Sequence, residues 1–262
     1  MRTNDPVAVP SHDFKRVYVW ELPVRLHHWI TVLCLFVLTV TGLLIAHPPA
    51  LTSAAEASFS YWFGVNRFIH FVTAYVLLCS FVFRIYWGFA GNRYADWRNF
   101  VPWRRAQFRE ALDVLRVDIL QARNTPLHAV GHNAVAYFTY SAVFLLFVFQ
   151  IISGFAMYAL MSKFWFPQLF TWAVPLFGGE YGLHQWHYAI TWLFLVFTLI
   201  HVYLVFYHDY VEGHGVMSSM MGGWKFVEKH VDEHGRPADG RSWFTPAASK
   251  AALPPSSSPP GA

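Results

Sequence analysis

Histidine is the residue type whose placement suggests chemistry in this chain. Of the 262 residues 14 are histidine, and the candidates among those in or at the ends of long apolar segments are His28, His70, His187 and His201. Ionisable side chains in such segments are costly to bury, and they usually face the interior of a helical bundle in a functional role. Because the neutral imidazole ring is a common metal ligand, these four histidines are candidate metal ligands.

The spacing of the histidines in the last apolar segment carries the most information. His187 and His201 are 14 residues apart. In an α-helix this separation returns to within about 40° of the same face and covers about 21 Å along the axis. One histidine therefore lies near each surface of a membrane, on the same side of the helix. From His184 the separation is 17 residues, about 100° off that face, so His187 is preferred and His184 is the alternative.

Four long apolar segments must position these histidines. Hydrophobic residues make up 55% of the chain and charged residues 13%, whereas a soluble domain has about 45–50% and about 25%. Each segment is long enough to cross a bilayer core of about 30 Å as a helix. We therefore predict an all-α integral membrane protein, a four-transmembrane-helix bundle within residues 27–210. Its spans cover about residues 27–47, 66–90, 133–161 and 184–208.

The basic residues predict the orientation of this bundle. They are concentrated in the N-terminal segment 1–26, the connection 91–132 and the tail 211–262, whereas the other two connections hold only Arg67 and Lys163. The positive-inside rule then places both termini and the connection 91–132 in the cytoplasm. The excess positive charge lies on one membrane face and needs no nucleic-acid partner. The tail is Pro/Ser/Ala-rich from about residue 247 and is predicted to be disordered there.

This topology arranges the four histidines as two pairs at two depths. His28 and His201 lie at cytoplasmic helix ends and are called the inner pair, and His70 and His187 are called the outer pair. Two imidazoles from facing helices are the axial ligands that a six-coordinate haem iron requires. The chain has only two cysteines and no Cys-x-x-Cys-His sequence, so a haem would be held non-covalently. We therefore predict two b-type haems between the helices, one at each pair.

Two arginines and two glycines agree with this prediction. Arg25 and Arg67 each precede a histidine of a pair by three residues, a spacing that shares a helix face, so each is placed to pair with a haem propionate. Gly42 and Gly154 leave room for the face of a porphyrin or for a neighbouring helix. Structural interpretations stay open as well: arginines at helix ends extend to lipid headgroups, and a membrane histidine often only hydrogen-bonds a neighbouring helix.

Two other kinds of site are less compatible with the sequence. Zinc needs four ligands around one centre, and two pairs about 20 Å apart cannot supply them. The predicted spans contain no Asp or Glu, which argues against a transporter that moves protons or metal ions by buried carboxylates. A haem-free membrane anchor or transporter remains the alternative of another class.

The first span carries a motif that resembles a known family. Residues Arg25 to Gly42 resemble the R-x-x-H-W…T-G signature of the b-type cytochrome subunit of membrane-bound nickel–iron hydrogenases. The resemblance covers about residues 16–230, and the cytochrome subunit of formate dehydrogenases, which shares the four-helix, two-haem plan, is the near alternative. Shorter motifs follow in the order of the family: Arg67-Phe-Ile-His70, Arg84-Ile-Tyr-Trp87, Gly131-His132-Asn133 and Ile200-His201-Val-Tyr203.

The resemblance implies a multi-pass anchor and electron conduit in the bacterial inner membrane. A large nickel–iron subunit and a small iron–sulfur subunit would dock on its periplasmic face, in a complex that can itself form an oligomer. Electrons from hydrogen would pass from the outer to the inner haem and then to quinone. His132 and Asn133 are the predicted quinone residues, with helix capping as the alternative role of Asn133. Two cysteines cannot hold nickel or iron–sulfur centres, so the chain alone is not expected to act on hydrogen.

Overall fold

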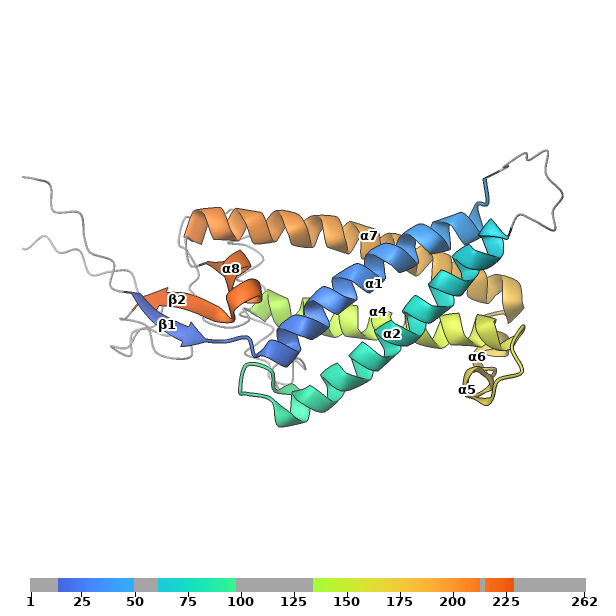
Figure 1. The fold of residues 1–262 in the computed structure, drawn as a ribbon, viewed down its shortest axis with the longest axis horizontal. Helices are drawn as coiled ribbons and strands as arrows, with labels where there is room; N and C mark the ends of the chain where they lie inside the picture. The colour runs from blue at the N-terminus through green and yellow to red at the C-terminus, as the bar shows by residue number, and fades with distance from the viewer. Residues whose placement is uncertain (1–13, 50–60, 98–133, 213–214, 229–262) are drawn as a thin grey trace, which may run out of the picture.

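The computed structural model describes residues 14–49, 61–97, 134–212 and 215–228. Four long helices run along the molecule, a small sheet and α8 lie at one end, and α5 and α6 lie at the opposite end (Figure 1). We call these the sheet end and the α5–α6 end. The elements are β1 (Phe14–Tyr18), α1 (Leu22–Ala46), α2 (Trp62–Ala90), α4 (Ala134–Ala159), α5 (Trp165–Gln168), α6 (Ala173–Leu176), α7 (Gly179–Glu212), α8 (Val216–Gly222) and β2 (Trp224–Glu228).

The helices α1, α2, α4 and α7 are long and apolar enough to cross a membrane. Many of their large apolar side chains point outward, and Leu33, Phe36 and Leu199 are more than 60% exposed. Exposed apolar side chains all around a bundle suit hydrocarbon as the surrounding solvent, and helices satisfy their own backbone hydrogen bonds there. The predicted all-α bundle with four spanning helices is confirmed.

The first helix begins earlier than its predicted span, which starts at about residue 27. It begins at Leu22, and a proline stands in its first turn, where proline is favoured because its fixed φ suits a helix start. The preceding residue, Glu21, accepts hydrogen bonds on Oε2 from Trp87 Nε1 at 2.9 Å and from the backbone N–H of Asn92 at 2.8 Å. A polar turn that the apolar pattern does not show therefore ties the start of α1 to the end of α2.

The long helices pack as two pairs, α1 with α2 and α4 with α7. In the first pair the buried Asn66 of α2 donates from Nδ2 to the backbone carbonyl of Thr41 at 3.1 Å. In the second pair Gln150 of α4 donates from Nε2 to the carbonyl of His187 at 3.2 Å and to Thr191 Oγ1 at 3.1 Å. Each helix pair is thus joined by an amide side chain close to one histidine of the outer pair.

A two-stranded antiparallel sheet joins the two segments that flank the bundle. β1 pairs with β2 with Phe14 opposite Glu228 and Tyr18 opposite Trp224. The residue before β2, Gly223, has φ of 87°, and a Cβ there would lie 2.6 Å from Tyr18 Cε2, so this turn requires glycine. Residues 1–26 and 211–262 were predicted as separate segments, whereas the structure links them through β1, α8 and β2, which we call the clasp.

The clasp also contacts the sheet end of α1. Arg25 Nη1 donates to the carbonyl of Met221 in α8, and Trp29 Nε1 donates to the carbonyl of Met220 at 3.2 Å. Because α8 follows directly after α7, these two bonds connect the sheet end of α1 to the sheet end of α7. The clasp therefore lies where the two histidines of the inner pair enter the bundle.

Candidate functional site

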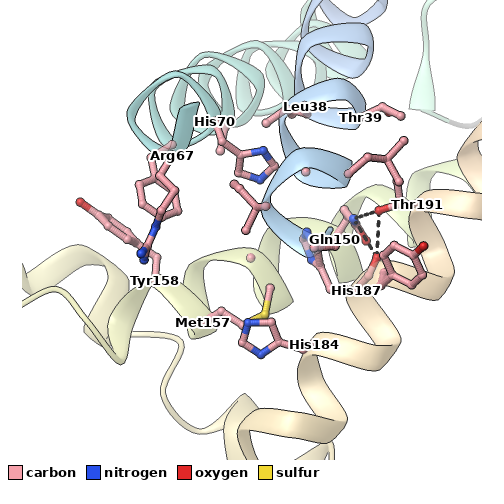
Figure 2. A pocket seen from close by; sticks show the side chains of 18 of the residues that line it. Leu38, Thr39, Arg67, His70, Gln150, Met157, Tyr158, His184, His187 and Thr191 are labelled. Carbon is pink, nitrogen blue, oxygen red and sulfur yellow. Dashed lines mark hydrogen bonds between the residues drawn. The ribbon is translucent and has the colours of Figure 1, made fainter. Parts of the chain in front are cut away.

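The outer pair lines a cavity between the helices. His70 projects from α2 and His187 from α7 into this cavity of about 630 Å³ (Figure 2). Its walls are mainly apolar and aromatic, and the polar side chains that line it include Gln150, Arg67 and His184. The volume falls within the range of about 300–1,000 Å³ that is typical of cofactor and ligand sites.

A buried hydroxyl and the backbone of Leu38 both contact the ring of His70. Thr41 Oγ1 lies 2.8 Å from His70 Nδ1, and the same hydroxyl donates its proton to the carbonyl of Val37 at 2.7 Å. A hydroxyl has a single proton to donate, so it accepts from the ring, and Nδ1 carries the hydrogen. The lone pair is then on Nε2, which is the arrangement that metal-ligating histidines adopt when their other nitrogen donates to a neighbour.

A second hydroxyl repeats this arrangement at His187. Ser153 Oγ lies 2.8 Å from His187 Nδ1 and donates to the carbonyl of Gln150 at 3.2 Å. With the Ser153 proton donated to Gln150, the hydrogen of His187 is assigned to Nδ1 and the lone pair to Nε2. Both rings of the outer pair therefore offer Nε2 as a ligand atom from opposite helix pairs.

The two glycines lie against the rings of the outer pair. A Cβ at Gly42 would lie 3.3 Å from Cε1 of His70, and a Cβ at Gly154 would lie 3.2 Å from Cε1 of His187. Both distances are shorter than ordinary side-chain contacts of about 3.5–4.0 Å. The glycines thus provide space for the imidazole rings at the positions where the sequence predicted clearance for a porphyrin or a helix.

The inner pair brings α1 and α7 together at the sheet end. The ring centres of His28 and His201 are 6.5 Å apart with an angle of 54° between the ring planes. Metal–imidazole bonds of about 2 Å put the centres of two axial rings roughly 6–6.5 Å apart. His201 also stacks on Phe197, with 5.4 Å between centres and 19° between planes. The separation fits one metal ion held by both rings.

Three polar atoms on one face of α1 have no protein partner within the described residues. They are Arg25 Nε, His28 Nδ1 and Thr31 Oγ1, all buried, and they recur at every third position of the helix. Buried polar atoms are nearly always hydrogen-bonded in proteins, so this face suits a ligand that carries hydrogen-bonding groups. Imidazoles for iron and an arginine for a carboxylate are the donor set of a haem with its propionates.

Two further polar residues stand in the wall of the outer cavity. Arg67 lies over the rings of Phe63 and Phe71, at 5.9 and 6.0 Å from their centres. His184 is exposed, and its Nδ1 bonds the carbonyl of Glu180 at 2.9 Å; Figure 2 shows it beside Met157. Of the two candidate outer ligands on α7, His187 is the one that a hydroxyl and a glycine hold in place.

Some predicted features lie outside the part of the chain that the structure describes, and two residues of the outer site were not predicted. The predicted quinone residues His132 and Asn133 and the predicted disorder from residue 247 lie outside the described residues. Thr41 and Ser153 were given no role in the sequence-based prediction, although each directly precedes one of the two glycines. A hydroxyl residue before a small residue, opposite a histidine of the next helix, is the signal that would have found them.

Comparisons with known proteins are consistent along most of the chain. A family model described as prokaryotic cytochrome b561 matches residues 19–223. A probable Ni/Fe-hydrogenase B-type cytochrome subunit of Cupriavidus necator is 38% identical over 228 residues, which cover 85% of this chain and 92% of the relative. The protein of the same name from Azotobacter vinelandii is 39% identical over 216 residues, 81% and 89% of the two chains. A probable Ni/Fe-hydrogenase 1 B-type cytochrome subunit of Escherichia coli K12 is 36% identical over 213 residues, 79% and 90%.

Proposed function

Because the chain belongs to the prokaryotic cytochrome b561 family, we propose that it is the membrane anchor and electron-transfer subunit of a nickel–iron hydrogenase. It is a multi-pass membrane protein, and its relatives are b-type cytochrome subunits. Their names favour a hydrogenase over a formate dehydrogenase as the partner enzyme. The localisation that agrees with these bacterial relatives is the inner membrane.

In this proposal the chain holds two b-type haems. His70 and His187 would hold the outer haem, His28 and His201 would hold the inner haem, and Arg67 and Arg25 would pair with propionates. The observation that carries the proposal is the outer pair, in which hydroxyls lie 2.8 Å from both Nδ1 atoms and the lone pair of each ring is assigned to Nε2. Haem iron between two imidazoles supplies reversible one-electron transfer.

The protein's own contribution is position and insulation. The spans keep the two pairs at two depths in an apolar surrounding, and a large nickel–iron and a small iron–sulfur subunit dock on the periplasmic face. Quinone would be reduced near the cytoplasmic face, with His132 and Asn133 as the residues proposed to bind it and to supply its protons. The cytoplasm then supplies protons to quinone while hydrogen oxidation releases protons outside, so no carboxylate relay across the spans is needed.

A visible spectrum with haem counting tests the proposal. The chain is purified in detergent with its partner subunits, a reduced-minus-oxidised spectrum is recorded, and non-covalent haem is extracted and counted per polypeptide. Two haems support both pairs, whereas none in cells that supply haem would remove the electron-transfer function and favour a haem-free anchor. Nickel in the co-purified partner, rather than molybdenum, identifies a hydrogenase.

A matched pair of variants tests the choice of outer ligand. His187→Ala is expected to lose one haem, and His184→Ala is expected to keep both. If His184→Ala loses a haem and His187→Ala does not, the assignment of the outer ligand is wrong, although the proposed electron-transfer function would stand.

A further inference from the structure

We propose that Thr41 and Ser153 are a matched pair of positioning residues, which fix the tautomer and the rotation of the two imidazoles of the outer pair. The inference rests on the proposed haem between His70 and His187. It states that these hydroxyls control the reduction potential of that haem and the orientation of its ligands. Neither hydroxyl would touch the haem iron, because each acts through the ring nitrogen that faces away from the ligand atom.

The geometry forms a short relay of hydrogen bonds at each ring. The ring Nδ1–H donates to the hydroxyl, and the hydroxyl donates to a carbonyl one turn earlier in its own helix, that of Val37 or of Gln150. Thr41 is 7% exposed and Ser153 is fully buried. Water therefore does not compete for these bonds, and each ring keeps one tautomer and one orientation.

The same arrangement occurs in both helix pairs, which argues against an incidental contact. In α1 and α2 the residues are Thr41 and His70, 29 positions apart, and in α4 and α7 they are Ser153 and His187, 34 positions apart. In both cases a glycine follows the hydroxyl residue and lies against the same ring atom, Cε1.

A hydroxyl in one of these helices does not need a histidine to be satisfied. Thr73 and Thr198 donate to carbonyls of their own helices at 2.7 Å, as serine and threonine commonly do. The bond that each hydroxyl of Thr41 and Ser153 donates to a carbonyl is therefore explained by the need to satisfy its own proton. The second bond, which the hydroxyl accepts from Nδ1–H, serves the histidine.

The relay has a defined consequence for the iron. An acceptor at the outer nitrogen of a ligating histidine raises the basicity of the ligand, and a more basic imidazole favours ferric over ferrous iron. A neutral hydroxyl leaves the ring a neutral imidazole, with less electron donation than a carboxylate partner would give. Removing the hydroxyl is therefore expected to raise the reduction potential of the outer haem and to let the ring rotate.

The test uses Thr41→Val, which keeps the shape of the side chain, and Ser153→Ala, which removes a single oxygen atom. Each variant is produced and purified as the complete complex. Its haems are then followed by redox titration and by electron paramagnetic resonance of the ferric state. We expect the affinity of the site for ferric haem, relative to ferrous haem, to fall by up to tenfold. For one electron this corresponds to an upward shift of the reduction potential by about 59 mV. Haem retention during dialysis is expected to weaken by about 10–100-fold.

Two controls separate the hydroxyl from packing. Thr41→Ser keeps the acceptor without adding volume and is expected to keep the wild-type potential. Thr73→Val removes a hydroxyl of α2 that does not line the cavity, and it is expected to change neither haem. An unchanged potential and ferric signal in both Thr41→Val and Ser153→Ala would overturn the inference, and so would a shift in Thr41→Ser equal to that in Thr41→Val.

Failure of the inference is distinguishable from failure of the proposed function. If His70→Ala and His187→Ala retain as much haem as the wild type, the outer haem itself is misplaced and the proposed site fails. If those variants lose the outer haem while the hydroxyl variants behave as wild type, only the role of Thr41 and Ser153 is wrong.

Discussion

The outer and inner pairs are held in different ways. Both rings of the outer pair are bound at Nδ1 by a hydroxyl and lie against a glycine. In the inner pair, Nδ1 of His28 is buried without a hydrogen-bond partner among the described residues, and His201 is exposed and stacks on Phe197. The outer pair is therefore organised by the protein alone, whereas the inner pair leaves polar atoms for a ligand to satisfy.

The source of this difference is the packing of the helices. Thr41 and Ser153 each act across a packed helix pair, α1 with α2 and α4 with α7. Both histidine pairs bridge the two helix pairs, but each outer histidine is also held by a hydroxyl of the neighbouring helix in its own pair. Side chains locked by such bonds are preorganised, whereas Nδ1 of His28 has no such bond among the described residues and the clasp connects the ends of α1 and α7.

Removing a ligand gives the largest expected effect and separates the pairs by function. His28→Ala or His201→Ala should leave an outer haem that hydrogen still reduces, and should block quinone reduction. His70→Ala or His187→Ala should leave the inner haem unreduced by hydrogen. Haem content and hydrogen-dependent quinone reduction are the measurements. Quinone reduction at the wild-type rate in both inner variants would show that the inner pair is not on the path.

Filling a glycine should disturb the outer pair alone. Gly154→Ala places a methyl group 3.2 Å from Cε1 of His187, and such overpacking costs about 1–3 kcal/mol. Haem retention is measured with His28→Ala as the background, so that only the outer haem is followed. Gly64→Ala, which meets nothing within 4 Å, is the control. Equal losses of haem in the two glycine variants would contradict the close fit inferred at His187.

Distorting the clasp should disturb the inner pair alone. Gly223→Ala puts a side chain at a φ of 87° and 2.6 Å from Tyr18 Cε2, a strain of about 1–3 kcal/mol. With His70→Ala as the background, the inner haem is expected to bind up to about tenfold more weakly. The neighbouring Gly222→Ala has open space around its Cβ and should behave as wild type. A weaker outer haem when Gly223→Ala is made with His28→Ala as the background would contradict the separation of the two sites.

The smallest expected effect is at the contact between α1 and α8. Trp29→Phe removes the hydrogen bond to the carbonyl of Met220, which is worth about 0.5–1.5 kcal/mol. The inner haem should bind a few-fold more weakly, and the outer haem should be unchanged. Trp192→Phe, at an exposed position of α7, is the control. Haem titration of both variants decides whether the clasp acts through this bond.

Sequence patterns were sufficient for the spans, and they singled out the two glycines, although for clearance of a porphyrin or a helix rather than of the rings. The four apolar segments are local features, and α1, α2, α4 and α7 follow them. The spacing of His187 and His201 fixes their relative direction on one helix, so depth and face could be predicted together. Gly42 and Gly154 were singled out because small residues within a span are informative on their own.

The hydroxyls and the clasp could not be predicted in the same way. Thr41 and Ser153 look like Thr73 and Thr198 in sequence, and only their neighbours across the helix interface distinguish them. The strands of the clasp are five residues each and pair across about two hundred residues, a distance at which no local pattern reports a partner. The early start of α1 depends on Glu21, whose contacts are likewise non-local.

The clasp also sets an order of events during synthesis. Its first strand is made before α1 and its second strand after α7 and α8, so β1 has no partner until the last span has left the ribosome. Residues far apart in the chain pair late because a long loop must close first. The sheet end of the bundle is therefore not yet held together by the clasp while the spans insert into the membrane. Pairing of β2 with β1 is the final step of assembly.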